Sequence, residues 1–219
     1  MSKIRNSNTI NPKLQSLSED QFKLLQILEK EYTTAYKILN IMPSYTVTVY
    51  GGAKLKEESN IYSEIVKICT TLSKEGWGMV SGGGPGAMEA ALKGGNIGGA
   101  PTTAFKIDLL REQTNSDATN EYLFTSFAPR KHALRQSDVY IFVPGGWGTF
   151  DELFELVTLQ KVNKIQNKPI ILYNKEYWTG ILKWLKETVL KEGLITQEEL
   201  ESLIVMDSVE EVTSFLLKR

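Results

Sequence analysis

The chain has 219 residues, of which 42% are hydrophobic, and this is enough for one domain with a sizeable core. Its 25 basic and 26 acidic residues leave a net charge of −1, which argues against a protein that binds nucleic acid through bulk electrostatics. There is no apolar stretch of the roughly 18 residues that a membrane span needs, and the N-terminus shows no apolar signal core, so we expect a cytoplasmic protein with no membrane partner.

Cys69 and His132 are the single cysteine and the single histidine of the chain. One cysteine forms no internal disulfide, and the two residues together build no His/Cys metal cluster. A serine triad would have to use His132, and the sequence has no G-x-S-x-G turn to present the serine. We therefore expect no metal and no cofactor, and we interpret His132 as part of a helix face.

The N-terminal part divides into a polar tail and a helix. We expect residues 1–17 to be disordered. The helix is predicted to start at Ser18, because Ser18-Glu19-Asp20-Gln21 fits a capping box. Packing on the domain is the simpler interpretation of its apolar stripe, and contact with a second copy is the alternative. The stripe has helical spacing and consists of Phe22, Leu25, Leu28, Tyr32, Ala35 and Leu39.

After this helix, strand and helix patterns alternate to the end of the chain. The predicted strands are short apolar runs at 45–50, 78–81, 102–107, 138–143, 170–173 and 204–206. The predicted helices lie at 61–72, 88–93, 130–136, 178–189 and 209–217, and 109–121 is expected to be a polar loop. Such alternation predicts an α/β fold, a Rossmann-like doubly wound parallel sheet. Residues 18–219 would form this single domain, with one extra N-terminal helix.

Glycine-rich turns follow three of these strands, at 51–52, 82–86 and 145–148. Ligands of open parallel sheets bind beyond the carboxyl ends of the strands. All three turns should lie at that edge, where they could converge on one pocket.

The third turn belongs to the run VPGGWGTFDE at 143–152. A helix is predicted to open directly after it, so the helix dipole and the first N–H groups would favour a phosphate. Glu152 lies about one turn into this helix and can face the same pocket. The alternative is a structural turn with a capping threonine and first-turn acids. The candidate phosphate-binding residues of this run are Gly145, Gly146, Gly148 and Thr149.

The second turn contains Gly82-x-Gly84-x-x-Ala87, a weak match to the dinucleotide fingerprint. An NAD(P)-dependent oxidoreductase is therefore one alternative, although the fingerprint should follow the first strand and this turn follows a later one. Glu89 could accept hydrogen bonds from a ligand hydroxyl, or else complement the helix dipole. The candidate binding residues here are Gly82, Gly83, Gly84, Met88 and Glu89.

Two adjacent cations, Arg130 and Lys131, stand on the short predicted helix before the 143–152 run. A guanidinium group offers a planar fork to an anion or to the edge of a base, so the pair would suit a nucleotide. The alternative is an ordinary solvated pair.

Together, SGGGPGAMEAA at 81–91, the pair Arg130-Lys131 and PGGWGTFDE at 144–152 resemble the LOG ("Lonely Guy") family of cytokinin-activating proteins and their bacterial relatives, long labelled "possible lysine decarboxylase". The PGGxGTxxE signature of that family is met in full. The resemblance runs from about Val47 to the C-terminus and includes LLREQTN at 109–115. It implies a homodimer with pockets at the interface. It also implies a phosphoribohydrolase that cuts the N-glycosidic bond of a nucleoside 5′-monophosphate, AMP or an N6-substituted AMP.

The resemblance also implies that Arg130, with Lys131 beside it, and Glu152 form the catalytic pair. Three departures bear on the substrate base: the spacing from Arg130 to Pro144 is one residue short, Pro129 changes the start of the helix, and the bulky Trp147 fills the variable signature position. A non-catalytic nucleotide-binding or sensing protein of the same fold is the main alternative. Lysine decarboxylation is the weakest.

Overall fold

The computed structural model describes residues 17–109 and 117–218. The predicted disordered tail lies outside the described residues except for Leu17, and so does nearly all of the LLREQTN segment.

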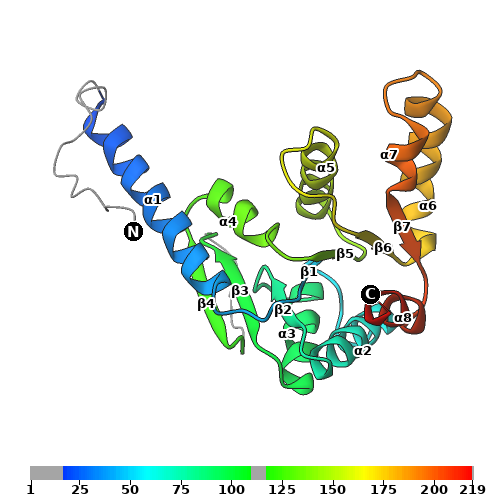
Figure 1. The fold of residues 1–219 in the computed structure, drawn as a ribbon, viewed down its shortest axis with the longest axis horizontal. Coiled ribbons are helices and arrows are strands. Elements are labelled where there is room, and N and C mark those ends of the chain that lie inside the picture. Colours follow the sequence, from blue (N-terminus) through cyan, green and yellow to red (C-terminus); the bar gives the residue numbers. More distant parts are fainter. Residues whose placement is uncertain (1–16, 110–116, 219) are drawn as a thin grey trace, which may run out of the picture.

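In the described residues, seven parallel strands form one sheet in the order β4-β3-β2-β1-β5-β6-β7 (Figure 1). From β1, the strands β2, β3 and β4 follow on one side and β5, β6 and β7 on the other. The direction in which the chain adds strands therefore reverses between β1 and β5. These two strands pair directly, with Val47 opposite Val139 and Tyr50 opposite Phe142. The predicted doubly wound parallel sheet is confirmed. The strands are β1 (Thr46–Tyr50), β2 (Gly78–Ser81), β3 (Thr102–Ile107), β4 (Asn120–Phe124), β5 (Val139–Phe142), β6 (Ile170–Tyr173) and β7 (Leu203–Met206).

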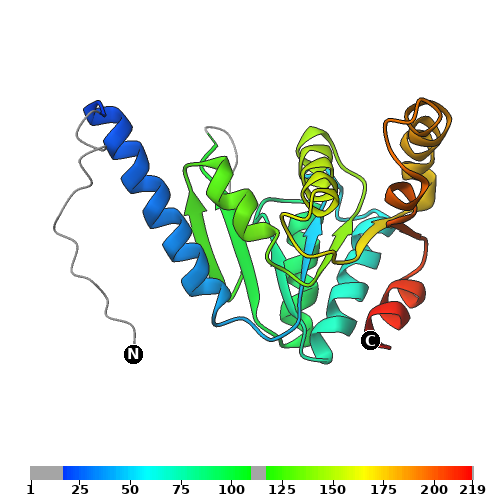
Figure 2. The same ribbon diagram turned by 45° about the horizontal axis from the view of Figure 1, so that its top comes forward.

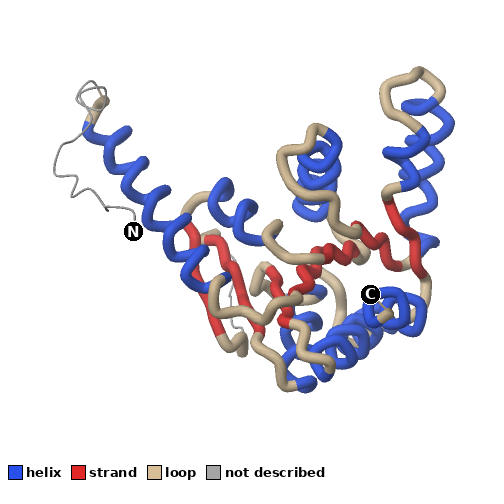
Figure 3. The backbone as a smooth tube through the Cα atoms, in the orientation of Figure 1, coloured by secondary structure: helices blue, strands red, loops and turns tan. Residues whose placement is uncertain are grey.

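Helices cover both faces of the sheet (Figures 1 and 2). One face carries α1 (Glu19–Leu39), α4 (Phe127–Leu134), α5 (Trp147–Lys161) and α6 (Lys175–Trp184). The other face carries α2 (Asn60–Lys74), α3 (Ala87–Gly98) and α8 (Val209–Leu217). Each face has its own apolar core, because strands buried on both sides point alternate side chains to opposite layers. Figure 3 shows these helices enclosing the strands.

The extra N-terminal helix is confirmed, and it begins with the predicted capping box at Ser18. Its second half packs on the domain, where the buried Glu31 accepts hydrogen bonds from the N–H (2.6 Å) and the hydroxyl (2.8 Å) of Thr125. Its first half extends beyond the sheet (Figure 1) and leaves Leu24, Leu25 and Ile27 exposed. The packing interpretation therefore holds for only half of the stripe.

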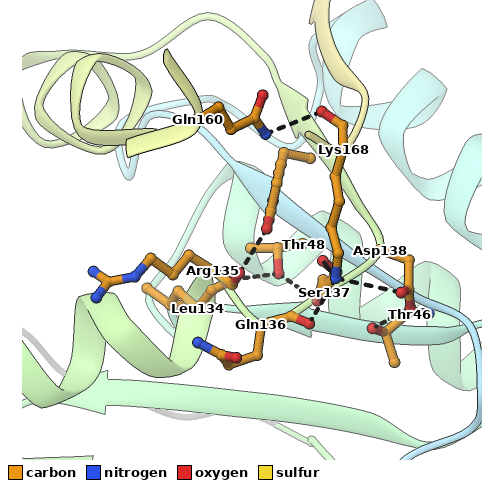
Figure 4. Close-up of polar contacts among 10 residues, drawn as sticks. Thr46, Thr48, Leu134, Arg135, Gln136, Ser137, Asp138, Gln160 and Lys168 are labelled. Atoms are coloured by element: carbon orange, nitrogen blue, oxygen red, sulfur yellow. Dashed lines mark hydrogen bonds and ion pairs between the residues drawn. The ribbon is translucent and has the colours of Figure 1, made fainter. Parts of the chain in front are cut away.

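A polar network ties β1, β5 and β6 together at the amino-terminal edge of the sheet (Figure 4). The Lys168 ammonium group, just before β6, donates to the Ser137 carbonyl at 2.7 Å and lies 3.4 Å from Asp138 Oδ1. Asp138 Oδ2 in turn accepts the Thr46 N–H at 3.0 Å. These charges therefore serve the fold, at the edge opposite to the glycine-rich turns.

The structure differs from expectation at three elements. The expected loop at 109–121 ends inside β4, an edge strand that begins with two polar residues and buries only Phe124 fully. Edge strands face solvent, so their sequences lack the continuous apolar run of central strands. The helix expected at 178–189 is α6 followed by a π-helical segment (Leu185–Leu190), and the short helix α7 (Gln197–Glu201) was not expected.

Among the described residues, no helix has both the length and the apolar character needed to cross a membrane.

Candidate active site

The three glycine-rich turns meet where the strand order reverses. The N–H of Gly52 donates to the Pro144 carbonyl at 3.0 Å, and the Gly52 carbonyl accepts the Ala87 N–H at 3.2 Å. Gly51 leaves no room for a side chain, since a Cβ there would overlap Val143 and Ala87. The turns therefore lie together at the predicted edge, where open α/β sheets bind ligands, and a shared pocket stays a prediction.

The signature loop opens α5 beside this junction. Helix α5 begins at Trp147, and the first N–H to close a helical bond is that of Phe150, to the Gly146 carbonyl at 3.1 Å. A Cβ at Gly146 or Gly148 would meet no atom within 4 Å, so the loop backbone faces open space there. Thr149 is buried against Gly145. Open N–H groups at the positive end of a helix form a cradle for an anion.

Tyr177, at the start of α6, fixes this loop from outside, because its hydroxyl donates to the Gly145 carbonyl. Sequence reasoning missed this contact, since nothing local in the sequence links 177 to 145. Trp147 stands at the mouth of the loop with 91% of its surface exposed.

Arg130 lies on α4, whose N-cap is Ser126 and whose third residue is Pro129, a position in the first turn where proline removes no helical hydrogen bond. The Arg130 Nε donates to the Phe105 carbonyl of β3 at 2.6 Å. Its guanidinium group lies against Gly82, where a Cβ would overlap Arg130 and Met88. The shortened spacing to Pro144 therefore leaves Arg130 beside the second glycine turn.

Glu152 lies on the sheet-facing side of α5 and is 7% exposed. Burial raises the pKa of this carboxyl from 4.5 to about 7, and the positive charges of Arg130 and Lys131 oppose the shift. Within the two described stretches, no hydrogen bond or ion pair holds the carboxylate. The structure thus places Arg130 and Glu152, which come from different helices, within each other's electrostatic reach.

Lys131 is oriented differently from Arg130. Its ammonium group pairs with Asp151 (2.9 Å) and Glu155 (3.0 Å) of α5, and Arg135 reaches Glu155 at 3.1 Å. These ion pairs bind α4 to α5 and so fix Arg130 relative to Glu152. A direct substrate contact by Lys131 stays a prediction.

The other predicted residues of the second turn lie around the start of α3. Gly82, Gly83 and Gly84 are buried, and Gly83 adopts a positive φ of 72° against the side chain of Lys106. Glu89 is exposed, and its charge acts on Tyr62 of α2. Their contacts with a ligand stay predictions.

His132 is a residue of a helix face, as predicted. Its Nε2 lies 2.6 Å from the Tyr36 hydroxyl of α1, and its Nδ1 lies 3.0 Å from Arg135. Burial, followed by the charge of Arg135, lowers its pKa. Among the described residues, no group of three or more His, Cys, Asp and Glu side chains could hold a metal ion.

Two residues near Arg130 and Glu152 were not predicted from the sequence. Lys106 of β3 is buried beside Gly83 and forms an ion pair with Glu121 at 2.6 Å. Tyr50 ends β1 and is 5% exposed, and the charges of Glu152 and Arg130 both act on it. A lysine within the apolar run TTAFKI and a tyrosine directly before Gly51-Gly52 were the available signals.

Comparison with known proteins supports the sequence resemblance. The family model described as "possible lysine decarboxylase" matches residues 78–216. A protein of Mycobacterium tuberculosis named cytokinin riboside 5′-monophosphate phosphoribohydrolase is 28% identical over 182 residues, covering 79% of this chain and 94% of that protein. A protein of the same name from Arabidopsis thaliana, LOG1, is 27% identical and covers 78% of this chain and 81% of its own length.

Among solved structures, the molybdenum cofactor carrier protein of Chlamydomonas reinhardtii matches with a TM-score of 0.56 and 20% identity, over 80% of this chain and 96% of that one. The molybdenum cofactor binding protein of Rippkaea orientalis matches with a TM-score of 0.53 and 20% identity, over 81% and 96%. At these identities the likeness concerns the fold.

The burial of Glu152 predicts a pH-dependent cost in stability. Between its unfolded pKa near 4.5 and its folded pKa near 7, the folded protein holds a proton that the unfolded chain has lost. Stability therefore falls as pH rises through this window, and the full cost is present above about 7. Between pH 4.5 and pH 8, the free energy of unfolding of the wild type should fall by about 2–3 kcal/mol relative to that of Glu152→Gln. Glutamine does not ionise, so the variant escapes this cost.

Urea denaturation at both pH values measures this difference. Glu176→Gln, which changes an exposed carboxylate of α6, is the matched control and should show no comparable gain. If the free energy of unfolding of Glu152→Gln differed from that of the wild type by the same amount at both pH values, the Glu152 carboxylate would bear no burial cost.

Proposed function

Because the chain belongs to the LOG family, whose model carries the description "possible lysine decarboxylase", we propose that it is a nucleotide phosphoribohydrolase. Its substrate is AMP or an N6-substituted AMP, and its products are the free base and ribose 5-phosphate. The names of the two curated relatives support this class of reaction. It acts in the cytoplasm.

The observation that carries the proposal is that the charge of Arg130 acts on the buried Glu152 beside the open start of α5. Hydrolysis of an N-glycosidic bond creates positive charge on the ribose and negative charge on the leaving base. A carboxylate beside the ribose and a guanidinium group beside the base would match both charges, and preorganised groups of this kind act strongly where water is excluded.

The nucleotide would lie with its 5′-phosphate on the N–H groups of Gly146, Gly148 and Thr149. The Gly82–Gly84 turn, with Met88 and Glu89 behind it, would border the sugar. This placement puts the phosphate at the positive end of a 15-residue helix and leaves the glycosidic bond between the catalytic pair.

In the reaction, the ionised Glu152 holds a ribose hydroxyl or the attacking water and stabilises the oxocarbenium-like transition state. The bond from C1′ to the base nitrogen breaks with its electron pair going to the base, and a water oxygen bonds to C1′. One proton of that water ends on the base. Arg130 stabilises the departing base by charge and hydrogen bonding, because its guanidinium group is too basic to be an ordinary proton donor.

We also propose a homodimer whose interface closes the pocket. The apolar side chains of the first half of α1 and Trp147 at the pocket mouth are exposed to solvent. They can be buried only by contact with another molecule. A second copy would cover them and narrow the open side of the signature loop.

Cleavage should depend on both members of the pair. Incubation with AMP and with N6-prenyl-AMP should release base and ribose 5-phosphate, measured by chromatography. Glu152→Gln and Arg130→Ala should each lower kcat/KM by about 10²–10³-fold, the usual size of one lost transition-state contact. Glu176→Gln should keep the wild-type rate, and equal rates in all four proteins would place the reaction elsewhere.

The dimer predicts a dependence on α1. Leu24 and Ile27 are 51% and 42% exposed, and replacing both by glutamate should shift the mass from two chains toward the 24.6 kDa of one. Ile97→Glu, on α3 at the opposite face and 58% exposed, should leave the mass unchanged. Light scattering after gel filtration measures it, and a wild type with the mass of one chain would refute the dimer.

A further inference from the structure

The hydroxyl of Tyr50 is buried and makes no hydrogen bond with the part of the chain that the structure describes. Leaving such a group unsatisfied costs about 1–3 kcal/mol, so a buried phenol without a partner calls for an explanation. Tyr50 also ends β1 at the junction of the three glycine-rich turns. Its position links the unsatisfied hydroxyl to the site.

The ring of Tyr50 is held in place by β5. It stacks on Phe142 with ring centres 4.6 Å apart and planes 10° from parallel, and it packs against Tyr140 at 6.5 Å. Phe142 is its direct neighbour across the two strands. The hydroxyl therefore has little freedom to find another partner, and it is a preorganised donor.

The electrostatic surroundings of Tyr50 come from the catalytic pair. Burial, and after it the charge of Glu152, raises the pKa of Tyr50 well above its usual value, while Arg130 opposes the shift. The phenol is therefore neutral at working pH and offers a proton to share. The charged and titratable groups that face Tyr50 or Glu152 are Arg130 and Lys131 of α4, Asp151 and Glu155 of α5, and Tyr140 of β5.

Lack of a partner alone does not distinguish Tyr50. Tyr62 of α2 is also buried, and its hydroxyl likewise has no partner within residues 17–109 and 117–218, but it lies in the core on the opposite face of the sheet. The charges that act on Tyr62 are those of Glu89, Lys93 and Glu57. Only Tyr50 combines the unpartnered hydroxyl with a place beside Glu152, whose carboxylate has no hydrogen bond of its own in the described residues.

We propose that Tyr50 is a positioning residue whose hydroxyl donates a hydrogen bond to one water molecule, which in turn donates to the ionised carboxylate of Glu152. This bridge satisfies both buried groups and holds the carboxylate in one orientation toward the ribose. The role in catalysis rests on the proposed function, whereas the hydrogen bond itself does not.

The direct test is the titration of Glu152 by NMR in protein labelled with ¹³C at the glutamate carboxyls, the signal being assigned with Glu152→Gln. Tyr50→Phe removes only the hydroxyl. Because a donor stabilises the charged form, its loss should raise the pKa of Glu152 by about one pH unit. Tyr62→Phe, which loses an equally buried hydroxyl, should leave this titration unmoved.

Kinetics with AMP distinguish a role of Tyr50 in orienting Glu152 from a nonspecific structural effect of the substitution. Tyr50→Phe should lower kcat about tenfold with KM unchanged. The acid limb of its pH–rate profile should shift to higher pH by the same amount as the pKa of Glu152. The substrate phosphate titrates equally in both proteins, so the difference reports on the enzyme. In the Glu152→Gln background, Tyr50→Phe should cost nothing further, because the bond is already lost.

An unmoved Glu152 titration in Tyr50→Phe, or an equal movement in Tyr62→Phe, overturns the inference. A moved titration with an unchanged kcat overturns the positioning role. If the wild type cleaves no nucleotide while the titration moves as expected, the proposed function fails and the hydrogen bond stands. If cleavage is normal and the titration is unmoved, only the inference about Tyr50 fails.

Discussion

Strands β1 and β5 lie side by side where the strand order reverses, and the helices that follow them leave on opposite faces of the sheet. A crevice must open between the two helix starts, and only backbones without side chains can line it closely. Gly51 and Gly52 meet that demand, with Gly52 hydrogen-bonded to the first residue of α3 and to the loop that precedes α5. The open start of α5, Arg130 and Glu152 all lie around this junction.

The second constraint is electrostatic. A carboxylate at 7% exposure would be neutral at neutral pH without nearby cations, and Arg130 and Lys131 draw its pKa back to about 7. Lys131 also pairs with Asp151 and Glu155, so one residue both ties α4 to α5 and moderates the charge of Glu152. A carboxyl poised near neutral pH, which the fold sustains at a cost in stability, is typical of working acids and bases.

Much of this was predictable from sequence, because periodicity and glycine turns encode element order and the ligand-binding edge. The family, the parallel sheet, the capping box at Ser18 and the structural role of His132 are confirmed. Contacts between distant segments were not predictable: β4 is a half-exposed edge strand, and Tyr177 reaches Gly145 from another helix. In the sequence Tyr50 is an ordinary strand residue, and only the structure shows that its buried hydroxyl has no hydrogen-bond partner among the described residues.

In the proposed complex, the nucleotide lies with its phosphate on the signature loop and its glycosidic bond between Arg130 and residue 152. A crystal structure of Glu152→Gln soaked with AMP tests it most directly. We expect uncleaved AMP, with phosphate oxygens on the N–H groups of Gly146, Gly148 and Thr149, and the base beside the Arg130 guanidinium group. A phosphate bound on Arg130, or an empty signature loop with AMP elsewhere, would contradict it.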